Sequence, residues 1–236
     1  MLLPTPSLEV FVPDALWLRE YPVRLGGARF NARMTVMKLR TGEILLHSPC
    51  PFDDSLAAEV DALGRVSGII APGNFHWLHV RSWQQAFPEA TTYVCPGVER
   101  RAKGLSFDFV LGDETPRLWV DELSQVALQG TRVMREVAFF HRASRTLVLV
   151  DLIENFTPAT RGTNLFLRAL FRALGMWNRP SPAPEYRFAW GERSRVRQGM
   201  ERILAWDFER VILSHGDVIT SDARRIVTDA WRQILR

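Results

Sequence analysis

The sequence predicts a mixed α/β fold in which short buried strands alternate with amphipathic helices. Short apolar runs at 44–47, 68–71 and 211–213 end abruptly in polar residues, as buried strands do. The segment 55–63 between the first two runs has apolar residues at helical spacing. Strand, helix and strand in this order form a βαβ-like unit, and the carboxyl ends of its strands meet at one edge of a sheet.

Length and composition allow one sizeable hydrophobic core. The chain has 236 residues, of which 47% are hydrophobic, and it contains no internal repeat or low-complexity tract. We therefore expect a single domain over residues 1–236, with a helical insertion around 160–200.

The charge pattern does not favour nucleic acid as a partner. The formal net charge is +4, and 28 of the 30 basic residues are arginine. This bias is more typical of genome composition than of phosphate recognition. The arginines form no concentrated basic stripe with interleaved aromatic platforms, so no nucleic-acid binding is expected. The two cysteines imply no disulfide framework.

No targeting or transmembrane segment is evident. The N-terminus has neither the basic region nor the long apolar core of a signal peptide. No apolar run approaches the roughly 18 residues that a spanning helix needs. A cytoplasmic protein is therefore expected.

The N-terminal half is predicted to begin with successive β-strands between residues 8 and 48. A turn at Gly42 joins the last two as a hairpin, because glycine is favoured in tight turns. Asp53 precedes the helix at 55–63, as a helix-capping acid does, and Gly64 ends it. The expected elements are strands at 8–12, 28–39, 43–47, 68–71 and 92–95, and helices at 55–63 and 81–91.

The C-terminal half is predicted to add a second group of strands followed by helices. Its strands are expected at 125–129, 136–140, 146–151 and 211–213, and its helices at 162–176, 195–206 and from Ser221 to the end of the chain. Ser221 is expected to cap the last helix, because serine is a preferred N-cap residue.

The predicted helix at 162–176 is apolar on most of its circumference. Its only charged residues are Arg168 and Arg172, spaced i,i+4 along one narrow line. A helix that binds a membrane surface by itself should show a wide basic face, which this helix lacks, so we expect it to be buried and to cover the pocket. The buried surface could belong to a partner subunit, which leaves a homodimer as an open alternative.

Four predicted strand ends carry side chains that can bind metal ions. These are His47, His76 with nearby His79, Asp151 and His215. Imidazole and carboxylate are ligands of zinc, iron and manganese in hydrolytic centres. A shared polar pocket is the prediction, although histidines at strand ends are more often hydrogen-bonded packing residues than ligands.

Three other groups have both a functional and a structural interpretation. Cys50 follows His47 by three residues and is either an activated nucleophile or inert packing. Glu136, at a strand start, either orients a pocket histidine or faces solvent. The arginines at 187, 193, 195 and 197 either bind an anion or form a solvated, ion-paired helix face.

The order of elements and three segments resemble the metallo-β-lactamase superfamily, closest to its uncharacterised DUF4336 group. The segments are LLHSPCPFD at 45–53, EVAFFHRASRTLVLVDL at 136–152 and RVILSHGD at 210–217. The resemblance covers roughly residues 28–236. It implies a four-layer αβ/βα sandwich of two mixed β-sheets.

The metal motif of that superfamily is degenerate here. Its H-x-H-x-D-H motif falls on Pro72, Asn74, His76 and Trp77, and its third histidine position falls in the segment 130–134, which contains Thr131. The motif-matching Asp151 and His215 remain, and His47 occupies the position of a strand-ending aspartate.

The resemblance implies a tentative metal site of His76, Asp151 and His215, with a surrounding pocket. The pocket residues are expected to be His47, Asn74, His79, Thr131 and Glu136. One hypothesis is a mononuclear hydrolase that uses one zinc, iron or manganese ion on an unknown small-molecule substrate. The other is a non-catalytic ligand-binding or scaffold protein that has lost the dinuclear zinc site and holds no metal.

Overall fold

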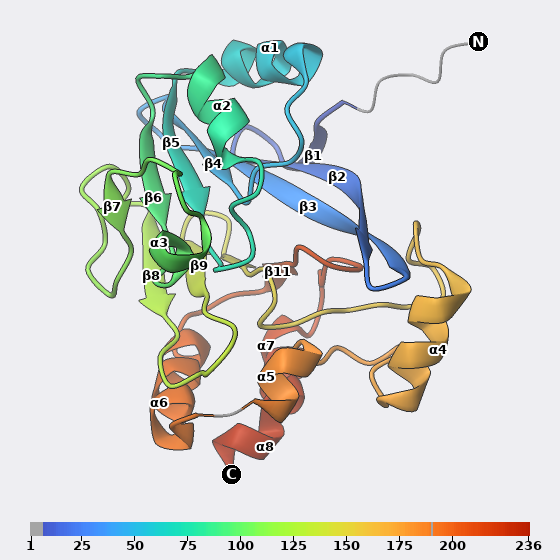
Figure 1. Ribbon diagram of the computed structural model, residues 1–236. Helices are drawn as coiled ribbons and strands as arrows, with labels where there is room; N and C mark the ends of the chain where they lie inside the picture. The colour runs from blue at the N-terminus through green and yellow to red at the C-terminus, as the bar shows by residue number, and fades with distance from the viewer. Residues whose placement is uncertain (1–6, 190) are drawn as a thin grey trace.

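The computed structural model describes residues 7–189 and 191–236. Two mixed β-sheets face each other, and helices cover the outer face of each sheet (Figure 1). This arrangement confirms the predicted α/β fold with two mixed sheets. Within the described residues, no helix has the length and apolar character needed to cross a membrane.

The first sheet has seven strands in chain order, antiparallel from β1 to β4 and parallel from β4 to β7. Its strands are β1 (Glu9–Val12), β2 (Leu16–Leu25), β3 (Ala28–Lys38), β4 (Ile44–His47), β5 (Val66–Ala71), β6 (Thr91–Val94) and β7 (Phe109–Val110). Strands β2 and β3 form one long hairpin, paired from Leu16 opposite Met37 to Leu25 opposite Ala28.

The second sheet has four strands in the order β11, β10, β9 and β8. Its strands are β8 (Leu123–Ala127), β9 (Val137–His141), β10 (Thr146–Val148) and β11 (Arg210–Ile212). The pair β10–β11 is parallel, and the other two pairs are antiparallel. The predicted hairpin connection between 140 and 146 joins β9 to β10.

The helices divide between the two sheets. They are α1 (Asp54–Leu63), α2 (Val80–Ala86), α3 (Val98–Arg101), α4 (Leu165–Ala173), α5 (Pro184–Phe188), α6 (Arg193–Leu204), α7 (Ala223–Ala230) and α8 (Arg232–Leu235). Helices α1 and α2 pack on the first sheet, whereas α6 and α7 pack on the second.

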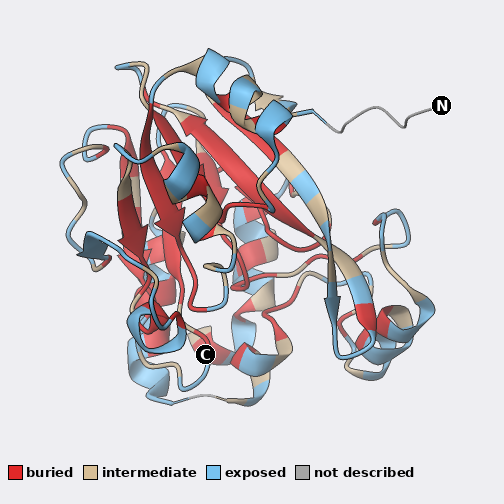
Figure 2. Ribbon diagram, turned by 45° about the horizontal axis from the view of Figure 1, so that its top comes forward, coloured by how far each residue is buried: buried red, intermediate tan, exposed pale blue. Residues whose placement is uncertain are grey.

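Alternation along strand β9 shows how two cores arise. Val137 and Phe139 belong to the core between the sheets, while Ala138 and Phe140 belong to the core beneath α6 and α7. Successive side chains of a strand point to opposite faces, so one strand serves both cores. All five residues of β9 are buried, which explains its nearly continuous apolar sequence. Figure 2 shows that much of the sheet strands has the colour of buried residues.

A buried arginine joins the two sheets. Arg33 on β3 donates to the carbonyl oxygens of Leu213 and Gly216, which follow β11, and pairs with Glu20 on β2. Because Arg33 is only 6% exposed, each of these partners compensates for water that the guanidinium has lost. The loop after β11 is thereby fixed against the first sheet.

Several element boundaries differ from the predictions. The helix predicted at 81–91 ends at Ala86, since Pro88 cannot continue a helix. The irregular region after 97 contains the short α3 and β7. Ser221 does not cap the last helices: Asp222 occupies the N-cap of α7 in a left-handed conformation, with no side-chain capping bond.

The burial predicted for the helix at 162–176 is wrong. Helix α4 spans only Leu165–Ala173, and among its residues only Leu167 and Phe171 are buried. Leu165 is 80% exposed and Phe166 52% exposed. The error arose because an apolar sequence shows how much surface a helix could bury, and not whether the rest of the chain covers it.

The loop between β11 and α7 depends on a close backbone approach at Gly216. This residue has φ +86°, and a Cβ atom there would lie 2.2 Å from the carbonyl oxygen of Asn155. We expect Gly216→Ala to lower the free energy of unfolding by roughly 3 kcal/mol or more, through strain plus a clash with rigid backbone.

Gly175→Ala is the matched control for this prediction. Gly175 also has positive φ, +65°, but has open space around it. Its substitution should cost only about 1–2 kcal/mol, the penalty of the left-handed conformation itself. Urea unfolding measures both variants, and equal losses would contradict the clash.

Candidate metal centre

Three ligand-type side chains converge where the two sheets meet. The Nε2 atom of His76 lies 3.1 Å from Oδ2 of Asp151, and the Nε2 atom of His215 lies 3.3 Å from Oδ1 of the same carboxylate. One ligand atom from each residue lies within 4.8 Å of the others. The side chains are only 7%, 7% and 10% exposed, so the cluster is largely closed to water.

Each residue of the cluster follows a buried strand. His76 lies in the loop after β5, Asp151 follows β10, and His215 follows β11. Of the residues that the strand-end pattern selected, these three come together in one cluster, whereas His47 and His79 lie outside it. The first sheet supplies one member and the second sheet two, so the cluster depends on the packing of the sheets.

The Nδ1 side of the His76 ring contacts Ser48, a serine in an unusual backbone conformation. The Nδ1 atom of His76 lies 2.8 Å from Oγ of Ser48, and the backbone N–H of His76 donates to Gly73. Ser48 has φ +55°, a conformation that few non-glycine residues adopt, and its own N–H donates to the carbonyl of Ile70. A hydroxyl can donate or accept, so Nε2 of His76 can face Asp151 as an N–H donor or as a lone pair.

His215 is held by the backbone of β3. Its Nδ1 lies 3.3 Å from the carbonyl oxygen of Asn31, which can only accept, so Nδ1 carries a proton. Burial alone would lower the pKa of His215, but the hydrogen bond and charge of Asp151 outweigh it and raise that pKa. Nε2 then either carries a second proton or offers its lone pair to a cation.

Asp151 is anchored by the buried carboxylate of Glu136. This side chain accepts hydrogen bonds from the backbone N–H groups of Val150, Asp151 and Leu152, at 2.7, 2.8 and 2.8 Å. Burial, followed by the charge of Asp151, raises the pKa of Glu136 to about 8. Glu136 therefore neither orients a pocket histidine nor faces solvent; it fixes the backbone that carries Asp151.

The Asp151 carboxyl remains ionised. Burial alone would raise its pKa, but the charge of His76 and the hydrogen bonds from both histidines hold the pKa well below its ordinary value. A permanently charged oxygen between two imidazole nitrogens favours a cation at this point.

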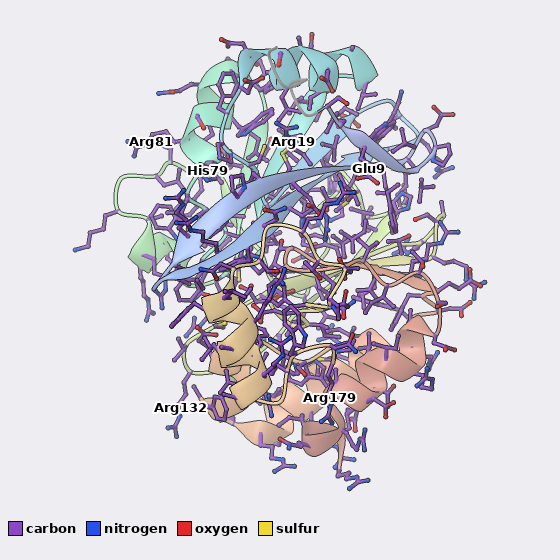
Figure 3. All side chains as sticks on the ribbon, turned by 90° about the vertical axis from the view of Figure 1, so that its right-hand side faces the viewer. Glu9, Arg19, His79, Arg81, Arg132 and Arg179 are labelled. Carbon is purple, nitrogen blue, oxygen red and sulfur yellow. The ribbon has the colours of Figure 1, made fainter. Side chains whose placement is uncertain are left out.

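The other sequence-selected residues lie around the cluster without joining it. Asn74 binds the carbonyl of Val133 and the N–H of Arg135 through its side chain, and so fixes two loops to each other. The His79 ring packs edge-on against Tyr21, with ring centres 5.6 Å apart (Figure 3). Thr131 donates to the carbonyl of Met134.

Thr131 and Glu136 line a separate cavity. Its volume is about 620 Å³, and Arg132, Arg135 and Arg195 also line it. None of the three cluster residues reaches it. The predicted pocket is therefore divided between a closed His–Asp cluster and an open, arginine-lined cavity.

His47 is buried directly beside the cluster. Its ring lies edge-on to Phe139, with centres 5.3 Å apart, and its Nε2 has no hydrogen-bond partner in the described part of the chain. Burial, followed by the neighbouring His76, lowers the pKa of His47 to about 3. The imidazole is therefore neutral at neutral pH.

Cys50 and the C-terminal arginines have structural roles. Burial raises the pKa of the Cys50 thiol to about 11, so it is not an activated nucleophile. On α6, Arg195 pairs with Glu192 and Arg197 with Glu201, each at 2.8 Å. The ion-paired helix face is thus the better interpretation for Arg195 and Arg197, whereas Arg187 and Arg193 donate to the backbone carbonyls of Leu174 and Gln233.

Sequence reasoning missed three side chains beside the cluster. The Tyr21 hydroxyl hydrogen-bonds with Ser48, and burial raises its pKa. Phe30 packs edge-on against His215, with ring centres 5.0 Å apart. Glu154 has a buried Oε2 without a partner among the described residues, and burial raises the pKa of its carboxyl to about 8. No motif marks these residues: long-range pairing brings Tyr21 and Phe30 here, whereas Glu154 follows Asp151 by three residues.

Replacing Glu136 tests its anchoring role. Glu136→Ala leaves three buried N–H groups without an acceptor, and we expect a loss of about 3–5 kcal/mol in the free energy of unfolding. Glu136→Gln keeps one acceptor oxygen and should lose less. Glu122→Ala is the control, because Glu122 accepts from a single backbone N–H, that of Arg40. Denaturant unfolding that ranks Glu122→Ala as the most harmful would contradict this role.

The neutral His47 should make the protein sensitive to acid. Its pKa is about 3 in the folded protein, against 6.5 for an unperturbed histidine, so the unfolded chain binds the proton first. Stability is complete above pH 6.5 and falls as the pH drops toward 3, by about 2 kcal/mol between pH 6.5 and 5. In His47→Leu, the loss of unfolding free energy between pH 6.5 and 5 should be smaller than in wild type by about 2 kcal/mol. Urea unfolding of both proteins at the two pH values measures this difference. An unchanged loss in His47→Leu would assign the acid sensitivity to other groups.

Comparison with known proteins supports the same architecture. The family model for a domain of unknown function, DUF4336, matches residues 13–162. No curated protein matches this chain. The DIM-1 metallo-β-lactamase exposed to ceftazidime matches with a TM-score of 0.64 and 15% sequence identity, over 97% of this chain and 98% of that chain.

Two further solved structures show the same likeness. The metallo-β-lactamase FIM-1 from Pseudomonas aeruginosa, in its mono-zinc form, has a TM-score of 0.64 and 9% identity, over 98% of each chain. VMB-1 at pH 5.5 has a TM-score of 0.67 and 9% identity, over 97% of each chain. At such identities the likeness concerns the fold. The chain therefore has the metallo-β-lactamase fold, and it belongs to the DUF4336 family.

Proposed function

We propose that this protein holds one divalent transition-metal ion at His76, Asp151 and His215, and that it is a hydrolase of a small-molecule substrate. The observation that carries the proposal is the convergence of three ligand atoms within 4.8 Å of one another. The Nδ1 atom of each imidazole has its own partner, Ser48 or Asn31, which directs Nε2 toward the shared point.

The donor set fits zinc, iron or manganese. Catalytic zinc sites use three protein ligands with an open position, and two histidines with one carboxylate also suit iron and manganese. The carboxylate is already ionised, so Asp151 can bind a cation without first losing a proton. The mono-zinc form of FIM-1 supports the idea that this fold can hold a single ion.

The chain's own residues would position substrate and ion. A bound divalent ion supplies Lewis-acid chemistry toward an ester, amide, lactone or phosphoryl group. Ser48 and Asn31 orient the two imidazoles, and Glu136 fixes the backbone of Asp151. The raised pKa of Tyr21 keeps its hydroxyl protonated, so it can donate a hydrogen bond to a substrate oxygen.

A non-catalytic role is the second candidate, and one observation favours it. Both oxygens of Asp151 already face imidazole nitrogens, and the three side chains are at most 10% exposed. A network in which each charged or polar atom already has a partner can hold the two sheets together without any metal ion. Under this candidate, the protein is a scaffold or ligand-binding member of its fold.

Metal analysis separates the two candidates. Protein purified without chelators should contain close to one equivalent of zinc, iron or manganese. Added metal should raise the Tm by roughly 5–10 °C at about 100 times its Kd, because a ligand that binds only the folded state stabilises it. Less than about a tenth of an equivalent, with no shift, would remove the hydrolase proposal.

Two single variants locate the ion. His215→Ala should abolish both the bound metal and the metal-dependent rise in Tm, because it removes one of three ligands. His79→Ala removes a nearby histidine outside the cluster and should retain both. Equal metal loss in the two variants would place the ion elsewhere.

A further inference from the structure

A protruding lobe is built from two segments that are distant in the sequence. It consists of residues 21–31, at the tip of the β2–β3 hairpin, and residues 156–180, which include α4; we call it the α4 lobe (Figure 1). Asn164 ties the segments together: its side chain accepts from the N–H of Arg29, and its amide donates to the carbonyl of Gly27. A small separate core lies inside, including Ala28, Phe156, Leu167 and Phe171.

The outward face of α4 is apolar and uncovered. Leu165, Phe166 and Leu170 are 80%, 52% and 39% exposed, and Leu25 at the hairpin tip is 67% exposed. The alanines of this helix, at 169 and 173, are also exposed. At 100° per residue these helix positions cover nearly half of the circumference. Such a continuous apolar surface indicates a binding face.

The α4 lobe is also strongly basic. It contains six arginines and no acidic residue: Arg24, Arg29, Arg161, Arg168, Arg172 and Arg179. Because the whole chain has a formal net charge of +4, the lobe carries +6 and the remainder carries −2. Within the described residues, none of the six is ion-paired, whereas Arg33, Arg145 and Arg225 elsewhere are. Figure 3 labels Arg179, which lies to the lower right of α4, beside the C-terminal helices.

Charge decides which partner suits this face. A symmetric contact between two copies would bring six arginines against six, and like charges in apposition oppose binding. An anionic lipid surface offers negative headgroups to the arginines and hydrocarbon to the leucine and phenylalanine side chains. The arginines of α4 lie along one edge of its apolar face, where their heads can reach headgroups while that face inserts.

We propose that the α4 lobe binds the surface of an anionic lipid bilayer, with Leu165, Phe166, Leu170 and Leu25 inserted among the acyl chains. The lobe lies on the surface and does not span it. Of the acidic residues at its base, Glu20 is paired with Arg33, and Asp217 accepts hydrogen bonds from the lobe's own Thr157 and Thr160, so among the described residues a single unpaired carboxylate stands beside six arginines. The inference is independent of any metal or activity.

Vesicle sedimentation tests this surface directly. Wild-type protein should sediment with vesicles of phosphatidylcholine plus phosphatidylserine, more weakly as salt rises, and little with phosphatidylcholine alone. Leu165→Asn with Phe166→Asn should lower the partition coefficient roughly tenfold or more. Arg24→Gln with Arg161→Gln should lower it by roughly fivefold per arginine, on anionic vesicles only.

The matched control removes two equally exposed apolar side chains elsewhere. Leu78 and Phe188 are 69% and 68% exposed and lie outside the lobe, so Leu78→Asn with Phe188→Asn should bind vesicles as wild type does. Circular dichroism checks that each variant is folded. The proposal is overturned if wild type ignores anionic vesicles, or if the Leu165 and Phe166 substitutions leave binding unchanged. A wild-type dimer that these substitutions convert to monomer, without vesicle binding, would instead assign the face to a second copy.

Discussion

The hydrogen bonds of Glu136 are the constraint on which the site depends. The chain leaves the sheet after β10 while still buried, so the N–H groups of residues 150–152 lose their ladder partners. One carboxylate accepts from all three. This places two buried acids, Glu136 and Asp151, close to each other, an arrangement whose repulsion must be offset nearby. The raised pKa of Glu136 relieves this repulsion, and both oxygens of Asp151 face imidazole nitrogens, those of His76 and His215.

A second constraint comes from the first sheet. The β2–β3 hairpin brings Asn31 and Arg33 to the second sheet, where they contact His215 and the loop after β11, and Tyr21 of the same hairpin contacts Ser48 at the end of β4. The cluster is therefore assembled only when the two sheets pack. The site is formed by the contact between the two sheets. Substitutions of Arg33 or Gly216 that weaken this contact should therefore also weaken the site, although neither residue is a ligand.

The sequence predicted the members of the cluster better than it predicted their support. His76, Asp151 and His215 were among five side chains found because they lie at or shortly after the ends of apolar strands, which is a local signal, and the family resemblance narrowed the set to these three. Ser48, Glu136 and Tyr21 act through partners far along the chain, and no local pattern encodes such pairing. The family resemblance gave the layers correctly, but it could not show that Glu136 serves the backbone. The same limit explains α4, since exposure depends on what the remaining chain covers.

Helix α4 has one side that packs against the protein and another that is exposed. Leu167 and Phe171 hold it against Phe156 and the hairpin, and Phe156 contacts Phe30, which contacts His215. The opposite side chains, Leu165 and Phe166, are exposed and contribute little to that packing. Exposed apolar side chains at adjacent helical positions carry a cost in solubility that a purely structural helix could avoid with polar residues. Their presence is therefore explained by a partner outside the chain, and the uncompensated arginines beside them specify its charge.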